Sequence, residues 1–127
     1  MTQDEIQDIL DHAYPLIKSY FGKGKLDYPK IDTSYKNTYA MHSGEPEAEG
    51  EHSDTSIAEY YEGTIYLYLP NITNEEELLR ALVHEYTHYT QDNELFAKYR
   101  DMYSYDEDPI EIEAHKNEEN WRLFSKK

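Results

Sequence analysis

Apolar residues recur at helical spacing in the first part of the chain, between residues 3 and 21. They stand at Ile6, Ile9, Leu10, Ala13, Leu16, Ile17, Tyr20 and Phe21. This three-and-four spacing brings side chains to one face of a helix. Thr2 and Glu5 form a capping-box pattern before the stretch, and Gly22 follows it. The pattern predicts a helix, with a kink or an early end at Pro15.

A second helical pattern begins with a capping box at residues 73–76, which places acids in the first turn. Projected at about 100° per residue, its apolar side chains fall within an arc of roughly 140°. They are Leu78, Leu79, Leu82, Val83, Tyr86 and Tyr89. We expect this arc to face the core. Nothing before Ser104 breaks the pattern, so the helix can continue past Gln91 as far as Tyr99.

A third helix is predicted over residues 108–124, because it opens with an Asp suited to the N-cap and a Pro suited to the first helical position. The same projection gathers one set of side chains within roughly 100°. The set is Ile110, Glu113, Ala114, Asn117, Trp121 and Phe124. Glu113 is therefore expected on the buried face, whereas Glu111 and His115 are expected to point toward solvent.

The sequence between the first two predicted helices contains patterns typical of β-strands. Residues 26–41 are rich in Tyr and Thr and predict one strand. Residues 57–61 and 64–69 predict a hairpin, with Glu62 and Gly63 in its turn. The strand before the second helix would pair with an extended peptide if it lies at a sheet edge, and would have no ligand role if it is internal. Its candidate substrate-binding residues are Thr64, Ile65, Tyr66, Leu67 and Tyr68.

An acidic run at residues 43–54 contains no apolar side chain larger than Ala48. Its composition is typical of a solvated surface loop. A negatively charged loop near a peptidase cleft would also attract basic substrates, so both interpretations stay open.

The second helix carries His84, Glu85 and His88 in a His-Glu-x-x-His motif. Both histidines lie roughly 170° from the centre of the apolar arc, so they are not core residues. Two neutral imidazoles one turn apart can share a tetrahedral zinc, and Glu85, about 100° around the axis, can reach a water at the metal. The alternative is a helix whose two histidines are simply packed or solvated.

A third ligand has to come from elsewhere, and Glu113 is the candidate. An acid on an apolar face is unfavourable unless it is paired or bound to a metal. A metal site would explain Glu113. A peripheral carboxylate or a partner for an arginine remains the alternative.

Composition and net charge restrict the kinds of metal site and of partner that this chain can have. The 127 residues suffice for one domain, residues 1–127, and contain no cysteine, so a zinc ion would be held by His, Asp or Glu, which favours a catalytic site. A net charge of −15 argues against nucleic-acid and anionic-membrane binding and favours basic partners or substrates. The sequence shows no signal peptide and no transmembrane run, and we expect a cytoplasmic protein.

The two site segments resemble the gluzincin metallopeptidases, in particular the very small members that consist of little more than the catalytic half of the fold. The resemblance covers residues 64 to 124. It implies that His84, His88 and Glu113 bind one Zn2+ per chain and that Glu85 is the general base and acid. It also implies an edge strand at residues 64–68 that aligns the substrate.

The resemblance assigns further positions around this site. Asn117 stands where the family often has an acid that orients a ligand histidine. Tyr103 and Tyr105, between the two site helices, are candidates for stabilising the oxyanion.

Together these patterns predict an α+β, zincin-like fold with an N-terminal helix, a small and mostly antiparallel sheet, the active-site helix and a glutamate helix. The expected function is zinc-dependent hydrolysis of peptide bonds. Two alternatives remain: an acidic interaction protein that imitates nucleic acid, and an inactive binding module with a zincin fold. Partner binding that survives His84→Ala favours the first, and metal-loaded protein that cleaves no peptide favours the second.

Overall fold

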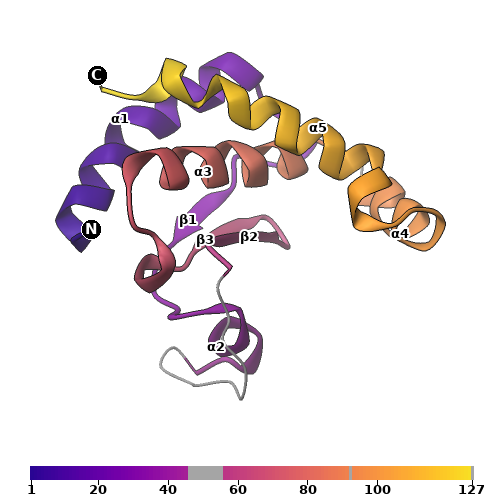
Figure 1. Ribbon diagram of the computed structural model, residues 1–127, viewed down its shortest axis with the longest axis horizontal. Helices are drawn as coiled ribbons and strands as arrows, with labels where there is room; N and C mark the ends of the chain where they lie inside the picture. Colours follow the sequence, from indigo (N-terminus) through magenta and orange to yellow (C-terminus); the bar gives the residue numbers. More distant parts are fainter. Residues whose placement is uncertain (46–55, 92, 127) are drawn as a thin grey trace.

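The computed structural model describes residues 1–45, 56–91 and 93–126. Within them the chain forms an α+β fold of five helices and a three-stranded sheet, as predicted at the level of class (Figure 1). The elements are α1 (Gln3–Phe21), β1 (Lys30–Asp32), α2 (Thr38–Ser43), β2 (Ala58–Tyr61), β3 (Thr64–Leu67), α3 (Glu75–Thr90), α4 (Asn93–Met102) and α5 (Pro109–Asn117). A 3-10 helix, Glu118–Phe124, continues α5. None of the described helices is long and apolar enough to cross a membrane.

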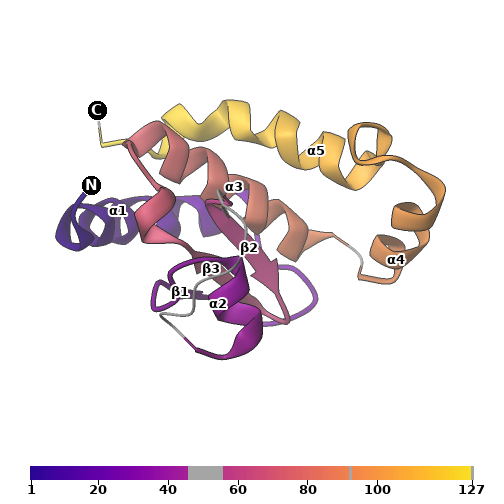
Figure 2. The same ribbon diagram turned by 60° about the horizontal axis from the view of Figure 1, so that its bottom comes forward.

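Helix α3 runs through the middle of the molecule. The sheet lies on one side of it, and α5 with its 3-10 continuation runs along another (Figures 1 and 2). The predicted apolar arc of α3 is buried in full, and α1 packs against it. Burial of this arc places the opposite face of α3, with its two histidines, under α5.

The first helix agrees with its prediction at both ends. The N–H of Thr2 donates to Oε1 of Glu5 at 3.0 Å, and the N–H of Glu5 donates to Oγ1 of Thr2 at 3.1 Å. Gly22 follows the helix with φ +85°, a left-handed conformation that glycine adopts without strain. The helix continues through Pro15, so the predicted early end does not occur.

The sheet is mixed, with strand order β1-β3-β2. β2 and β3 form the predicted antiparallel hairpin, and Glu62 and Gly63 both have positive φ, as a type I′ turn requires. β1 pairs parallel to β3, so the expectation of a mostly antiparallel sheet is corrected.

β3 is therefore the central strand, so of the two interpretations left open for Thr64, Ile65, Tyr66, Leu67 and Tyr68 the internal strand is confirmed, and the edge strand that the resemblance implied is wrong. The neighbour on that side is β1, the strand predicted within residues 26–41, which has only three residues and whose pairing partner the sequence did not indicate. Its pairing covers the edge of β3 that the sequence left open. The edge strand beside α3 is β2.

Two predicted helices end earlier than expected, and one helix was not predicted. Gln91 has an extended backbone, so α3 ends at Thr90 and α4 is a separate helix. The last helix is α-helical only to Asn117. The short helix α2 was not predicted. Most of the acidic run, residues 46–55, lies outside the described residues.

Tyrosine hydroxyls join the segment after α1 to the helices. Tyr86 on α3 is fully buried, and its hydroxyl donates to the carbonyl of Gly22. Tyr89 donates to the carbonyl of Leu26 at 2.6 Å and accepts from the N–H of Gly24 at 2.9 Å. These rings supply core packing and satisfy backbone groups of a segment without regular structure.

Replacement of Tyr86 by Phe tests this role. It should lower the free energy of unfolding by about 1 kcal/mol, because the partly buried carbonyl of Gly22 loses its donor. Urea unfolding followed by circular dichroism measures the change. The matched control is Tyr20→Phe, whose ring is 57% exposed and which should stay within about 0.5 kcal/mol of wild type. Equal stability of the two variants would contradict the assignment.

Candidate metal centre

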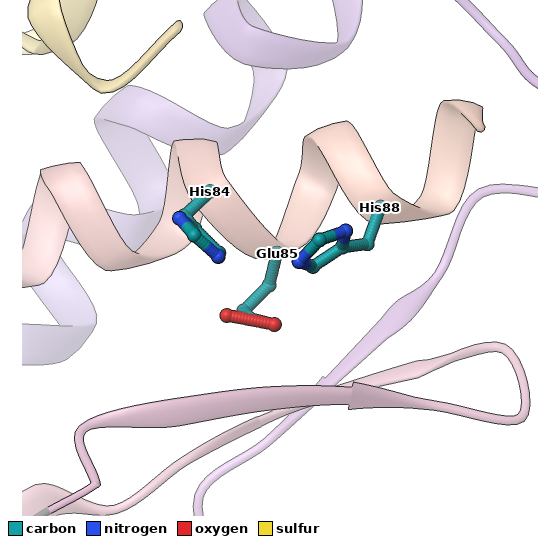
Figure 3. Close-up of side chains that lie close together, drawn as sticks. All are labelled: His84, Glu85 and His88. Atoms are coloured by element: carbon teal, nitrogen blue, oxygen red, sulfur yellow. The ribbon is translucent and has the colours of Figure 1, made fainter. Parts of the chain in front are cut away.

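Helix α3 presents His84, Glu85 and His88 toward the sheet and α5 (Figure 3). The side chain of Asn74 caps the helix by accepting the N–H of Glu77 at 2.9 Å, one residue later than the predicted cap. Four-residue spacing then sets the two imidazoles one turn apart, with ring centroids 4.8 Å from each other. One ligand atom from each of the three side chains lies within 4.8 Å of the others.

Glu111 of α5 completes the group. Its Oε1 lies 3.2 Å from Nε2 of His84 and 2.8 Å from Nε2 of His88. Coverage by α5 and the 3-10 helix leaves His84 only 9% exposed. The sequence predicted a facing helix with a carboxylate as the third ligand. The carboxylate that faces both histidines belongs to Glu111 and not to Glu113.

Glu113 does not reach the histidines. Its side chain is exposed and accepts from Nε2 of Gln91 at 2.9 Å, so its predicted place on the buried face is wrong. The projection treated residues 108–124 as one α-helix, although the 3-10 part turns about 120° per residue. In α5 alone, Ile110 and Ala114 mark the core face, and positions 111 and 113 flank it on opposite sides. α3 lies on the side of Glu111.

The second ring nitrogen of each histidine is also held. Nδ1 of His84 lies 2.7 Å from Oε2 of Glu118, and Nδ1 of His88 lies 2.8 Å from Oε1 of Gln91. Such contacts fix the orientation of an imidazole and leave its Nε2 for a metal. Asn117, expected in this role, instead donates to Oγ1 of Thr87 at 3.1 Å. The three-residue spacing from His88 to Gln91 was visible in the sequence, whereas Glu118 gave no such signal.

Glu85 is held by the sheet. Its Oε1 accepts the N–H of Tyr60 from β2 at 3.0 Å. Burial raises the pKa of Glu85 to about 7, although the neighbouring His84 and His88 favour its charged form. A carboxyl group with that pKa can both accept and release a proton near neutral pH.

The histidines hold their protons strongly in the metal-free protein. Burial disfavours charge on His84, but hydrogen bonds with Glu111 and Glu118 outweigh it and raise its pKa to about 10. For His88, burial also lowers the pKa and the hydrogen bond with Glu111 raises it. The net result is a raised pKa. The pKa of Glu111 is lowered well below its usual range, because the two histidines outweigh its own burial. The cluster is therefore a set of compensated charges.

Tyr105 and Tyr103 lie near this cluster. The hydroxyl of Tyr105 is 3.0 Å from Nε2 of His115, whose Nδ1 is 3.0 Å from Oε2 of Glu118. Partial burial and the charge of Glu111 raise the pKa of Tyr105 to about 12, so its hydroxyl keeps its proton. Tyr103 packs edge-on against Tyr99 at 5.6 Å. Both candidates line a cavity that also reaches Glu85.

The two distances from Glu111 to the histidines are close to those in a site for a small divalent cation. Ligand atoms around a tetrahedral zinc lie about 3.3 Å apart when the bonds are about 2.0 to 2.1 Å. The contacts of Glu111 with the two Nε2 atoms, 3.2 and 2.8 Å, need only a slight widening. His84, His115 and Glu118 form a second group of ligand-type side chains, but it shares His84 with the first.

Comparisons with protein-family models, curated proteins and solved structures found no match for this chain.

Proposed function

We propose that this chain is a zinc-dependent metallopeptidase with a zincin-like fold. His84, His88 and Glu111 would hold the metal, and Glu85 would be the general base. The observation that carries the proposal is the position of the Glu111 carboxylate, which faces both Nε2 atoms while other residues hold both Nδ1 atoms.

Zinc suits this set of donors. Two imidazole nitrogens and one carboxylate make three protein ligands, which is typical of catalytic zinc sites with a fourth position left for water or substrate. The chain has no cysteine, so a thiolate site is excluded. When bound, zinc supplies a Lewis acid that polarises a carbonyl and lowers the pKa of water.

Glu85 would move the proton. It lies between the two histidines on the side of the sheet (Figure 3), where a carboxylate can take a proton from water and give it to the leaving amine. The N–H of Tyr60 fixes one carboxylate oxygen, so the other is left for this transfer. An extended peptide along the edge strand β2 would pass directly beside Glu85.

Metal binding distinguishes the two acids of α5. Glu111→Ala should lower zinc affinity about 100-fold or more, because it removes a ligand, whereas Glu113→Ala should lower it by about tenfold at most. Competition with a chromogenic chelator measures both affinities, and wild type should bind one zinc per chain. Loss of zinc from Glu113→Ala with retention by Glu111→Ala would reverse the assignment.

Catalysis is tested at Glu85. Glu85→Gln should retain zinc and lower kcat for a fluorogenic peptide by about 10^2- to 10^4-fold, because the amide cannot accept the proton. Glu119→Gln makes the same change of charge at an exposed position and should leave kcat unchanged. Equal hydrolysis by wild type and Glu85→Gln would refute the role of Glu85.

Zinc affinity should continue to rise with pH above pH 7, where an ordinary histidine has already lost its proton. The metal has to displace the proton of His84, whose pKa is about 10, and that of His88, whose pKa is also raised, so affinity should rise by at least about tenfold per pH unit from pH 7 to 9. A histidine with an ordinary pKa near 6.5 would give a plateau above pH 7. Glu118→Gln removes one partner of the imidazolium and should move the plateau to lower pH. Chelator competition at each pH measures the profile, and a plateau above pH 7 in wild type would contradict the pairing.

A further inference from the structure

A cavity of about 630 Å³ adjoins Glu85, His88 and Glu111. The β2-β3 hairpin forms one of its walls and α4 another. Helix α4 lies beyond the C-terminal end of α3 (Figures 1 and 2).

Half of the lining residues are aromatic or aliphatic. They include Leu26, Tyr60, Tyr61, Phe96, Tyr103 and Ile110. Phe96 packs against the ring of His88 with centroids 5.7 Å apart, so the apolar wall begins at the metal ligand itself. Apolar walls of this kind stabilise a large apolar side chain by removing it from water.

Helix α4 also contributes a cation to this wall. Phe96, Arg100 and Tyr103 are spaced by four and three residues, so they share one face of α4, and all three line the cavity. Arg100 is the only Lys or Arg among the lining residues. Within the described part of the chain, its guanidinium has no ion pair, in contrast to Arg80, which contacts Glu76.

Most of the acidic side chains in the lining already contact other groups of the protein. Glu85 and Glu111 belong to the metal centre, and the Asp108 carboxylate caps α5 by accepting the N–H of Ile110 at 2.9 Å. Glu62 remains, in the exposed turn of the hairpin. Arg100 and Glu62 are thus the charged lining residues that neither the metal centre nor the helix cap uses, and Arg100 is the cation of the two.

We propose that this cavity selects peptides that carry a large apolar side chain together with a carboxylate, which pairs with Arg100. This inference rests on the proposed peptidase function and names its substrate class. The carboxylate can be the C-terminus of the peptide or an acidic side chain. The net charge of −15 repels such peptides at long range, so the contact with Arg100 acts at short range, where a bidentate ion pair fixes position.

Equilibrium binding tests the inference without turnover. Isothermal titration calorimetry with zinc-loaded Glu85→Gln protein, and again with metal-free wild type, would compare N-acetylated hexapeptides with a central Phe. In the first pair, one peptide ends in a free C-terminal carboxylate and the other in an amide. In the second pair, both peptides end in an amide, and one has Glu beside the Phe while the other has Gln there. Salt near 0.15 M limits the influence of distant charges, because the screening length is about 8 Å.

At least one carboxylate peptide should bind about tenfold more tightly than its neutral counterpart. The pair that shows the difference identifies the source of the carboxylate. Arg100→Gln should abolish the difference, whereas Lys98→Gln, the same change of charge on α4 outside the cavity lining, should preserve it. Replacement of the peptide Phe by Ala should weaken binding by about tenfold or more.

Three results would overturn the inference: equal binding of acidic and neutral peptides, a preference that survives Arg100→Gln, or tighter binding of a peptide with Lys beside the Phe, which would make Glu62 the selecting group. Binding selectivity in a chain that hydrolyses no peptide would retain this inference and reject the peptidase. If Arg100→Gln leaves peptide hydrolysis unchanged and binding is unselective, the peptidase function is retained and this inference is rejected.

Discussion

The contacts between two carboxylates and two imidazoles hold α5 and its 3-10 continuation against α3. Glu111 joins both Nε2 atoms, and Glu118 holds Nδ1 of His84. They meet on the face of α3 that the apolar arc leaves free, where histidines rather than aliphatic side chains form the surface. Buried ionic groups are stable only when every charge is compensated, so any position of α5 on α3 has to keep these contacts.

Local signals predicted much of this fold. The caps of α1 and α5, the hairpin turn and the buried arc of α3 each depend on residues close together in the sequence, and the structure confirms them. The His-Glu-x-x-His geometry belongs to the same class, because one helical turn determines it.

The errors concern contacts between distant segments. The choice between Glu111 and Glu113 depends on which flank of α5 meets α3, and helical periodicity treats the two flanks alike. The edge position of β3 depended on β1, a strand of three residues more than thirty positions away in the chain. Glu118 reaches His84 across 34 residues, so no spacing rule connects them. Tertiary packing decided each of these cases.

The charge balance of the centre connects its metal-free form with the proposed metal-bound form. Protons on His84 and His88 together carry two positive charges, which Glu111 and Glu118 compensate. A divalent cation between the same Nε2 atoms and Glu111 would replace both protons with no change in total charge. The carboxylates that raise the histidine pKa values are therefore suitably placed to stabilise the cation. Because Ile110, Ala114 and Phe124 anchor the α5 segment by apolar burial, the ligands are held in position before any metal binds.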